Sequence, residues 1–92
     1  MSTRANLTLA SNASADGSAT YWYGGHGLFT AEATWGGGTV KLQFKSLNGT
    51  WVDVPSASLT ANGAKEFYAP AGELRASVAT ATAVYAYAHF IP

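Results

Sequence analysis

Apolar side chains recur at every second position along most of this chain from His26 onward. The clearest run is residues 39–45, in which Val40, Leu42 and Phe44 alternate with polar side chains. Successive side chains of a strand point to opposite faces, so a period of two predicts strands with one buried face. No stretch shows the 3.6-residue apolar period of a capped helix.

Turn signals separate these runs at short intervals. Asn48-Gly49 and Asn62-Gly63 are the dipeptide favoured at tight hairpin turns, where positive φ is needed. Gly36-Gly37-Gly38 is followed by a strand pattern, so it predicts a hairpin connection with positive φ and not a phosphate-binding loop. A return strand is expected to start at Trp51 and stop at Pro55.

The pattern as a whole predicts an all-β fold, either a small antiparallel β-sandwich or a jelly-roll-like barrel of about seven strands. The side chains expected to point into one core are Val40, Leu42, Phe44, Leu74, Ala76 and Val78. In the closing strand, Tyr85, Tyr87 and His89 oppose a face that is mostly alanine, which is typical of a central strand or of one whose outer face meets a partner.

The first 25 residues differ from the rest. Residues 11–20 contain no large apolar side chain, and Leu7 and Leu9 form the only strand-like piece. We therefore predict a flexible N-terminal arm over residues 1–25 and a β-sandwich domain over residues 26–92. The arm would become ordered on a partner, with the Leu7-x-Leu9 strand adding to an exposed sheet edge by β-augmentation.

Charged residues make up only 11% of the chain and the formal net charge is zero, whereas ordinary soluble domains carry about 25% charged residues. Small domains that stay dispersed alone usually need a charged surface, so we expect a subunit that contacts other subunits, with homo-oligomers among them. Lys41 and Lys45 alone do not make the basic face that nucleic acid requires. No window approaches 18 apolar residues, so no membrane span is expected.

The residues with catalytic or metal-binding chemistry are few and scattered. His26 and His89 could in principle join Glu32 or Asp53, but they lack the close spacing of a recognisable metal site. No serine lies in a Gly-x-Ser-x-Gly turn, and the chain has no cysteine, which is compatible with a reducing cytoplasm. We expect no enzyme activity, no cofactor and no metal; the roles of the two histidines stay open.

Aromatic side chains are the one site-like feature. Trp22, Trp35 and Trp51 could form a sugar-stacking platform, as in small β-sandwich carbohydrate-binding modules, if at least two were exposed and coplanar. Trp35 and Trp51 are expected to anchor the core instead. Aromatic residues are enriched in buried interfaces. The candidate partner-contact residues are Leu7, Leu9, Tyr21, Trp22, Tyr23, Tyr85 and Tyr87.

Residues 33–92 resemble small β-proteins encoded among the virion genes of tailed bacteriophages. The resemblance rests on the Gly-rich turn and strand TWGGGTVKLQFKS, the NGTW hairpin return, the Leu59–Gly63 turn, the Pro70–Arg75 segment and the final Val/Tyr/Ala strand. In size and composition the chain is similar to capsid decoration (cement, head-stabilising) proteins.

This resemblance implies a protein without catalytic residues that binds the major capsid protein on the outside of the assembled head and stabilises it. It would be located in the virion after assembly in the host cytoplasm. Because the net charge is zero, binding is expected to depend on apolar contact and backbone pairing more than on ionic steering. The alternatives are a phage tail or head-fibre component and a carbohydrate-binding β-sandwich module.

Overall fold

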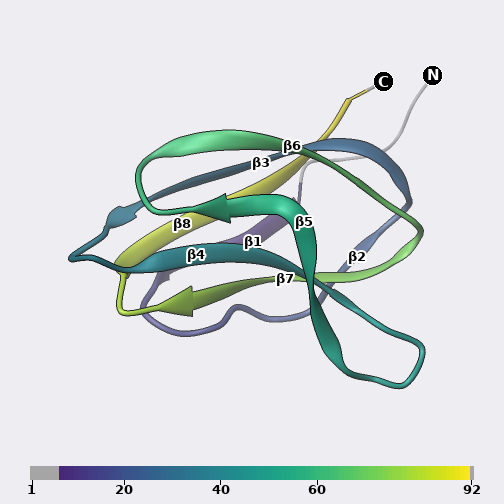
Figure 1. The fold of residues 1–92 in the computed structure, drawn as a ribbon, viewed down its shortest axis with the longest axis horizontal. Coiled ribbons are helices and arrows are strands. Elements are labelled where there is room, and N and C mark those ends of the chain that lie inside the picture. Colours follow the sequence, from purple (N-terminus) through teal and green to yellow (C-terminus); the bar gives the residue numbers. More distant parts are fainter. Residues whose placement is uncertain (1–6, 92) are drawn as a thin grey trace.

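The computed structural model describes residues 7–91, which form eight β-strands and no helix (Figure 1). The strands are β1 (Leu7–Ala13), β2 (Thr20–Trp22), β3 (Gly25–Thr34), β4 (Thr39–Lys45), β5 (Trp51–Leu59), β6 (Gly63–Ala69), β7 (Gly72–Ala79) and β8 (Thr82–Phe90). The predicted all-β fold is confirmed, with one strand more than the seven or so expected.

The strands form two four-stranded sheets that face each other, so the β-sandwich is confirmed. One sheet has the order β1-β8-β3-β6 and the other the order β2-β7-β4-β5. Every pair of neighbouring strands is antiparallel. Consecutive strands repeatedly cross from one sheet to the other, so the chain's first and last strands, β1 and β8, become neighbours.

The period of two correctly identified the core side chains. Val40 and Leu42 of β4 and Leu74 and Ala76 of β7 are fully buried, while Phe44 and Val78 pack against the core from half-buried positions. The opposite sheet contributes Phe29 and the inward side chains of β8, which are Val84, Ala86 and Ala88. No buried polar side chain occurs in the core among the described residues.

The N-terminal segment is part of the sandwich where the structure describes it, which differs from the predicted boundary at residue 25. β1 pairs with β8, β2 pairs with β7, and Leu9 and Trp22 lie in the core. The boundary at residue 25 was predicted because residues 11–20 contain no large apolar side chain. Residues 11–20 need few, because Gly17 N–H donates to Ala76 O at 2.9 Å and fixes the backbone against β7. Residues 1–6 of the predicted arm lie outside the described residues, and the arm's mobility in solution stays a prediction.

The chain turns at each of the predicted glycine-containing segments, but only the turn between β4 and β5 is a hairpin. β3 and β4 lie in different sheets, as do β5 and β6, so residues 35–38 and 60–62 pass from one sheet to the other and the hairpin predicted at Gly36-Gly37-Gly38 is wrong. Gly36 and Gly37 have φ values of 52° and 83°, as expected for the β3–β4 connection. The β4–β5 hairpin has a five-residue loop, 46–50, closed by Ser46 N–H donating to Thr50 O at 2.8 Å, with Gly49 at φ 85°. This loop extends beyond the body of the sandwich (Figure 1).

The strand expected to stop at Pro55 instead continues to Leu59. β5 is an edge strand, and proline is tolerated there because its missing N–H can lie on the unpaired side. Ser56 has φ 64° and the pairing register with β4 shifts between Lys41 and Gln43, so the strand passes the proline through an irregularity.

Two leucines allow a matched test of the core. Leu42 is 0% exposed whereas Leu47, in the 46–50 loop, is 109% exposed. We expect Leu42→Ala to lower the free energy of unfolding by about 2–5 kcal/mol, because a cavity remains where the side chain was. Leu47→Ala should change it by less than about 0.5 kcal/mol. Chemical denaturation followed by tryptophan fluorescence measures both, and equal effects would contradict the assigned core.

Candidate functional site: two contrasting sheet faces

Two of the predicted contact residues are core residues. The Trp22 side chain is 2% exposed; its Nε1–H donates to Ala69 O at 3.2 Å, and its ring lies 5.1 Å from the ring of Phe67. Gly27 makes room for both rings, since a Cβ there would lie 2.8 Å from Trp22 and 2.6 Å from Phe67. Trp22 and Leu9 therefore hold the sandwich together and cannot contact a partner.

The aromatic triplet at residues 21–23 is divided by the alternation of β2. Tyr21 and Tyr23 are exposed on either side of the buried Trp22, and their rings meet edge to face with centroids 5.0 Å apart. Leu7 packs partly against the core from β1. The structure thus brings together only Tyr21 and Tyr23 of the N-terminal candidates, and it leaves them in solvent.

The outer surface of the β1-β8-β3-β6 sheet collects the remaining candidates. Tyr85 of β8 lies opposite Glu32 of β3, and Tyr87 lies opposite Thr30. The next outward position of β8 is His89, opposite Leu28. We call this surface the tyrosine–histidine face; its residues are His26, Leu28, Thr30, Glu32, Glu66, Tyr68, Tyr85, Tyr87 and His89.

Seven of the nine members of this face were not singled out as contact residues from the sequence, and three of them, His26, Glu66 and Tyr68, lie together. Tyr68 is 75% exposed, and the ring of His26 stacks on it with centroids 4.6 Å apart and an interplanar angle of 11°. His26 Nε2 lies 3.1 Å from Glu66 Oε1. The alternation of Glu66 and Tyr68 with Phe67 already indicates that the first two share the outer side of β6. Spacing along the chain does not show that β3, which carries His26, pairs with this strand.

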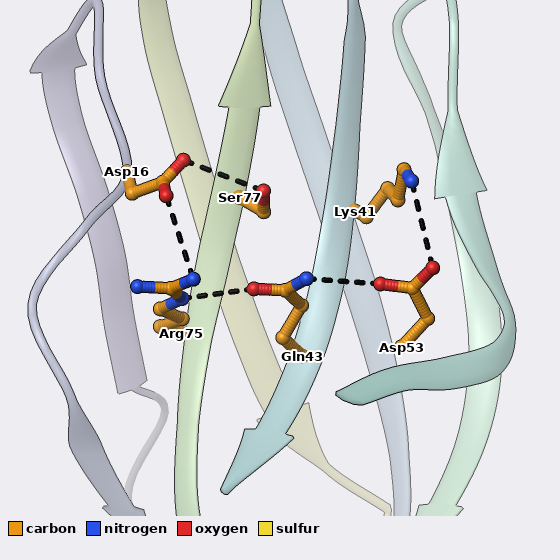
Figure 2. A network of polar contacts seen from close by, with 6 residues as sticks. All are labelled: Asp16, Lys41, Gln43, Asp53, Arg75 and Ser77. Atoms are coloured by element: carbon orange, nitrogen blue, oxygen red, sulfur yellow. Dashed lines mark hydrogen bonds and ion pairs between the residues drawn. The ribbon is translucent and has the colours of Figure 1, made fainter. Parts of the chain in front are cut away.

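The outer surface of the β2-β7-β4-β5 sheet carries a continuous polar network (Figure 2). Arg75 Nε–H donates to Gln43 Oε1 at 2.9 Å, and Gln43 Nε2–H donates to Asp53 Oδ1 at 2.9 Å. Lys41 Nζ lies 3.5 Å from Asp53 Oδ2 and Arg75 lies 3.5 Å from Asp16 Oδ2. We call this surface the polar face; it also holds the ion pair of Lys45 with Glu73 at 3.6 Å.

Asp16 joins the N-terminal segment to this network. Its Oδ1 accepts a hydrogen bond from Val78 N–H at 2.9 Å and from the Ser77 hydroxyl at 3.3 Å. The carboxylate therefore occupies the position beside β7 that a neighbouring strand would otherwise fill. Through Asp16, the network therefore ties the N-terminal segment to β7.

The structure does not provide a sugar platform of the expected kind. Trp22 is buried, and Trp35 and Trp51 are only partly exposed. Trp35 precedes the start of β4 and Trp51 lies opposite Lys45 at its end, so the two are separated by the length of that strand, roughly 20 Å. The Arg75 guanidinium also lies 4.7 Å from the centre of the Trp51 ring. Two exposed, coplanar tryptophans are therefore absent from residues 7–91.

The histidines occupy separate positions on the tyrosine–histidine face. His89 Nε2 lies 3.2 Å from Thr30 Oγ1, whereas His26 is beside Glu66. Among residues 7–91 no three His, Cys, Asp or Glu side chains gather where they could hold a metal ion. An open hollow of about 320 Å³ lies between β1 and residues 16–18, lined mainly by small side chains. The described part of the chain contains no helix that could cross a membrane.

Each of the four edge strands has a feature that discourages pairing with another chain. β1 has two register shifts, and β5 contains Pro55 and the positive φ of Ser56. β2 has only three residues. In β6, Phe67 and Ala69 point inward, and the alternation places Lys65 on the same side of the strand. An inward-pointing charge on an edge strand opposes edge-to-edge association. A face of the sandwich is therefore better suited to docking than an edge.

The network lowers the pKa of Asp53, mainly because Gln43 donates a hydrogen bond to its carboxylate and also because Lys41 is nearby. The pKa of Asp53 is lower in the folded state than in the unfolded state, where it is near 3.8. The ionised carboxylate therefore stabilises the folded protein above that unfolded pKa, and this stability is lost as the pH falls through the folded-state pKa. We expect Gln43→Ala to raise the pKa of Asp53 and to reduce this acid dependence. A carboxyl NMR titration measures it, with the exposed-loop change Asn48→Ala as control. An unchanged Asp53 pKa in Gln43→Ala would contradict the network.

No protein-family model and no curated protein matches the chain. Solved structures show the same fold. The SPBc2 prophage-derived protein YomS superposes with a TM-score of 0.71 at 12% identity, over 90% of this chain and 87% of YomS. The PBSX exported protein XepA superposes with a TM-score of 0.72 at 18% identity, over 90% of this chain but only 36% of XepA. At these identities the likeness establishes the fold alone.

Proposed function

We propose that this protein is a structural component of a bacteriophage virion that binds the outside of the assembled capsid and stabilises it. Its partner would be the major capsid protein, with further copies of its own chain as neighbours, and it would carry out no catalysis. The observation that carries the proposal is the tyrosine–histidine face, which has few charges and on which Tyr68 and Tyr85 are exposed and Tyr87 is partly exposed. The fold shared with the SPBc2 prophage-derived protein YomS, and with the PBSX exported protein XepA, supports a phage setting.

Stabilisation would follow from binding alone. A protein that contacts two neighbouring subunits of a shell binds only the assembled state, so its binding free energy is added to the cost of separating them. A sheet face suits this role because its side chains are held by paired strands, so little conformational entropy is lost on docking. Aromatic side chains contribute a large contact area with few rotatable bonds, and they dominate the energy of many interfaces.

A tail or head-fibre component is the alternative, because a shared fold does not specify a position in the virion. A carbohydrate-binding module has less support, since the expected tryptophan platform is absent from the described residues. Truncation is not a clean test of binding: removing residues 1–23 would also remove Leu9 and Trp22 from the core. Surface substitutions are needed instead.

The test is co-sedimentation of the purified protein with capsids assembled from the major capsid protein of the same phage genome. We expect saturable binding by the unmodified protein. The double variant Tyr85→Ala/Tyr87→Ala should bind at least about 30-fold more weakly, corresponding to the loss of about 2 kcal/mol at a hot spot. The matched control is Tyr21→Ala/Tyr23→Ala, which removes two exposed tyrosines from outside this face and should bind within about threefold of the unmodified protein.

Three results would count against this assignment in different ways. Absence of binding by the unmodified protein would contradict the capsid role, and binding to purified tails instead would favour the alternative. The reverse order of the two double variants would place the contact at Tyr21 and Tyr23, as the sequence alone predicted. Circular dichroism of each variant checks that the sandwich is intact.

A further inference from the structure

We propose that the tyrosine–histidine face binds a protein surface that presents arginine or lysine side chains, and that its affinity falls when His26 and His89 become protonated. This inference rests on the proposed function, because it specifies the chemistry of the capsid surface that the protein would contact. The observation that carries this inference is the uneven distribution of charge between the two outer faces of the sandwich.

The zero net charge of the chain conceals an uneven distribution. On the polar face, Arg75, Lys41 and Lys45 are paired with Asp16, Asp53 and Glu73 respectively, so positive and negative charges cancel. The tyrosine–histidine face carries Glu32 and Glu66 and, among residues 7–91, no lysine or arginine. With neutral imidazoles its formal charge is therefore −2, from two carboxylates and no cation.

These two carboxylates remain available to a partner. Glu32 lies opposite Tyr85, and none of the ion pairs of the described residues includes it. Glu66 contacts only His26 in this way, and its side chain is 70% exposed. Leu28 of β3 lies opposite Glu66, and Glu32 is four residues further along the same strand. Four residues of a strand span about 13 Å. Two cationic side chains at a similar spacing could pair with both.

The rings on this face are suited to the same partner. Tyr68 and Tyr85 are exposed beside Glu66 and Glu32, so a cation that pairs with either carboxylate also lies near an aromatic ring. A guanidinium stacks on tyrosine while it donates hydrogen bonds to a carboxylate, and this combination is a common interface contact. The polar face already shows the geometry within the chain, where Arg75 lies over the Trp51 ring.

A second copy of this chain is a poor occupant. Among residues 7–91 the only cationic side chain without an ion pair is Lys65, so a copy offers one cation to a face with two carboxylates. An anionic partner such as nucleic acid would be repelled. Charge complementarity therefore favours a different, basic protein surface.

The two histidines make this attraction depend on pH. His26 faces Glu66 and Tyr68, and His89 faces Thr30, Leu28 and Tyr87. The other titratable groups on the face are Glu32 and Tyr85, and Lys65 lies on β6 beside it. Protonation of both imidazoles would bring the formal charge of the face from −2 to 0 and remove its preference for a cation.

A hexa-arginine peptide tests the face without a capsid. We expect NMR chemical-shift changes at the outward positions of β3, β6 and β8, and none with a hexa-glutamate peptide. The variant Glu32→Gln/Glu66→Gln should bind hexa-arginine at least about tenfold more weakly. The matched control Asp53→Asn/Glu73→Gln removes the same net charge from the polar face and should retain the affinity within about threefold, because exposed charges at a distance are screened.

Affinity of the unmodified protein for the peptide should also fall at least about fivefold from pH 8 to about pH 5.5. In His26→Gln/His89→Gln this fall should disappear. Equal weakening by the two carboxylate variants, or shift changes on the polar face, would overturn the inference. So would unchanged affinity over this pH range.

The capsid experiment separates this inference from the proposed function. If the unmodified protein binds capsids and Glu32→Gln/Glu66→Gln binds equally well, the basic-partner inference is wrong and the capsid role stands. If the unmodified protein binds no capsid but hexa-arginine maps to the tyrosine–histidine face, the capsid role is wrong and the chemistry of the face stands.

Discussion

The burial of one side of β8 between the two sheets is the constraint on which the rest of this structure depends. β8 is central in its sheet, with β1 on one side and β3 on the other. Its inward side chains, Val84, Ala86 and Ala88, are fully buried. A shift of one residue in its register would expose these side chains and bury Tyr85, Tyr87 and His89. The core therefore determines which side chains the outer face presents, and burial of alanines on one side requires display of aromatic rings on the other.

The two outer faces use their polar groups in opposite ways. On the polar face, hydrogen bonds and ion pairs link Asp16, Arg75, Gln43 and Asp53 across the sheet, and this ties the N-terminal segment to β7. Such exposed pairs contribute little stability one by one; their effect is to satisfy the charges of this face internally. On the tyrosine–histidine face, none of the ion pairs among residues 7–91 includes Glu32, and Tyr68 and Tyr85 are exposed. A difference of this kind within one small domain indicates which side is available to a partner.

Much of the fold could be predicted from the sequence, because the signals for it are local. Alternation in residues 39–45 located β4 and its core side chains, and the glycines at 36–38 and 49 located two turns. The placement of β1 and β2 could not be predicted in this way. Their attachment depends on backbone pairing with β8 and β7 and on the Asp16 carboxylate, and these partners lie fifty or more residues further along the chain.

The candidate site was predictable only in part, for the same reason. Tyr85 and Tyr87 are neighbours in one strand, so their shared face followed from alternation alone. The contact of His26 with Tyr68 and Glu66 requires β3 and β6 to pair in a particular register, which no spacing in the sequence indicates. Trp22 shows the converse error: it was predicted to contact a partner, yet Gly27 in β3 leaves the space in which its ring is buried.

The comparison with YomS and XepA shows one fold shared by chains of very different sequence. Identities of 12% and 18% are compatible with one sandwich because the fold needs only inward apolar side chains at alternate positions and suitable turns. Outward positions are free of that requirement, so a shared fold carries no information about them. Strand addition at an edge would depend on backbone shape, which these proteins share, whereas docking on a face depends on outward side chains. All four edges of this sandwich have features that discourage pairing, so under the proposed function specificity would come from outward side chains, which differ most readily between proteins of this fold.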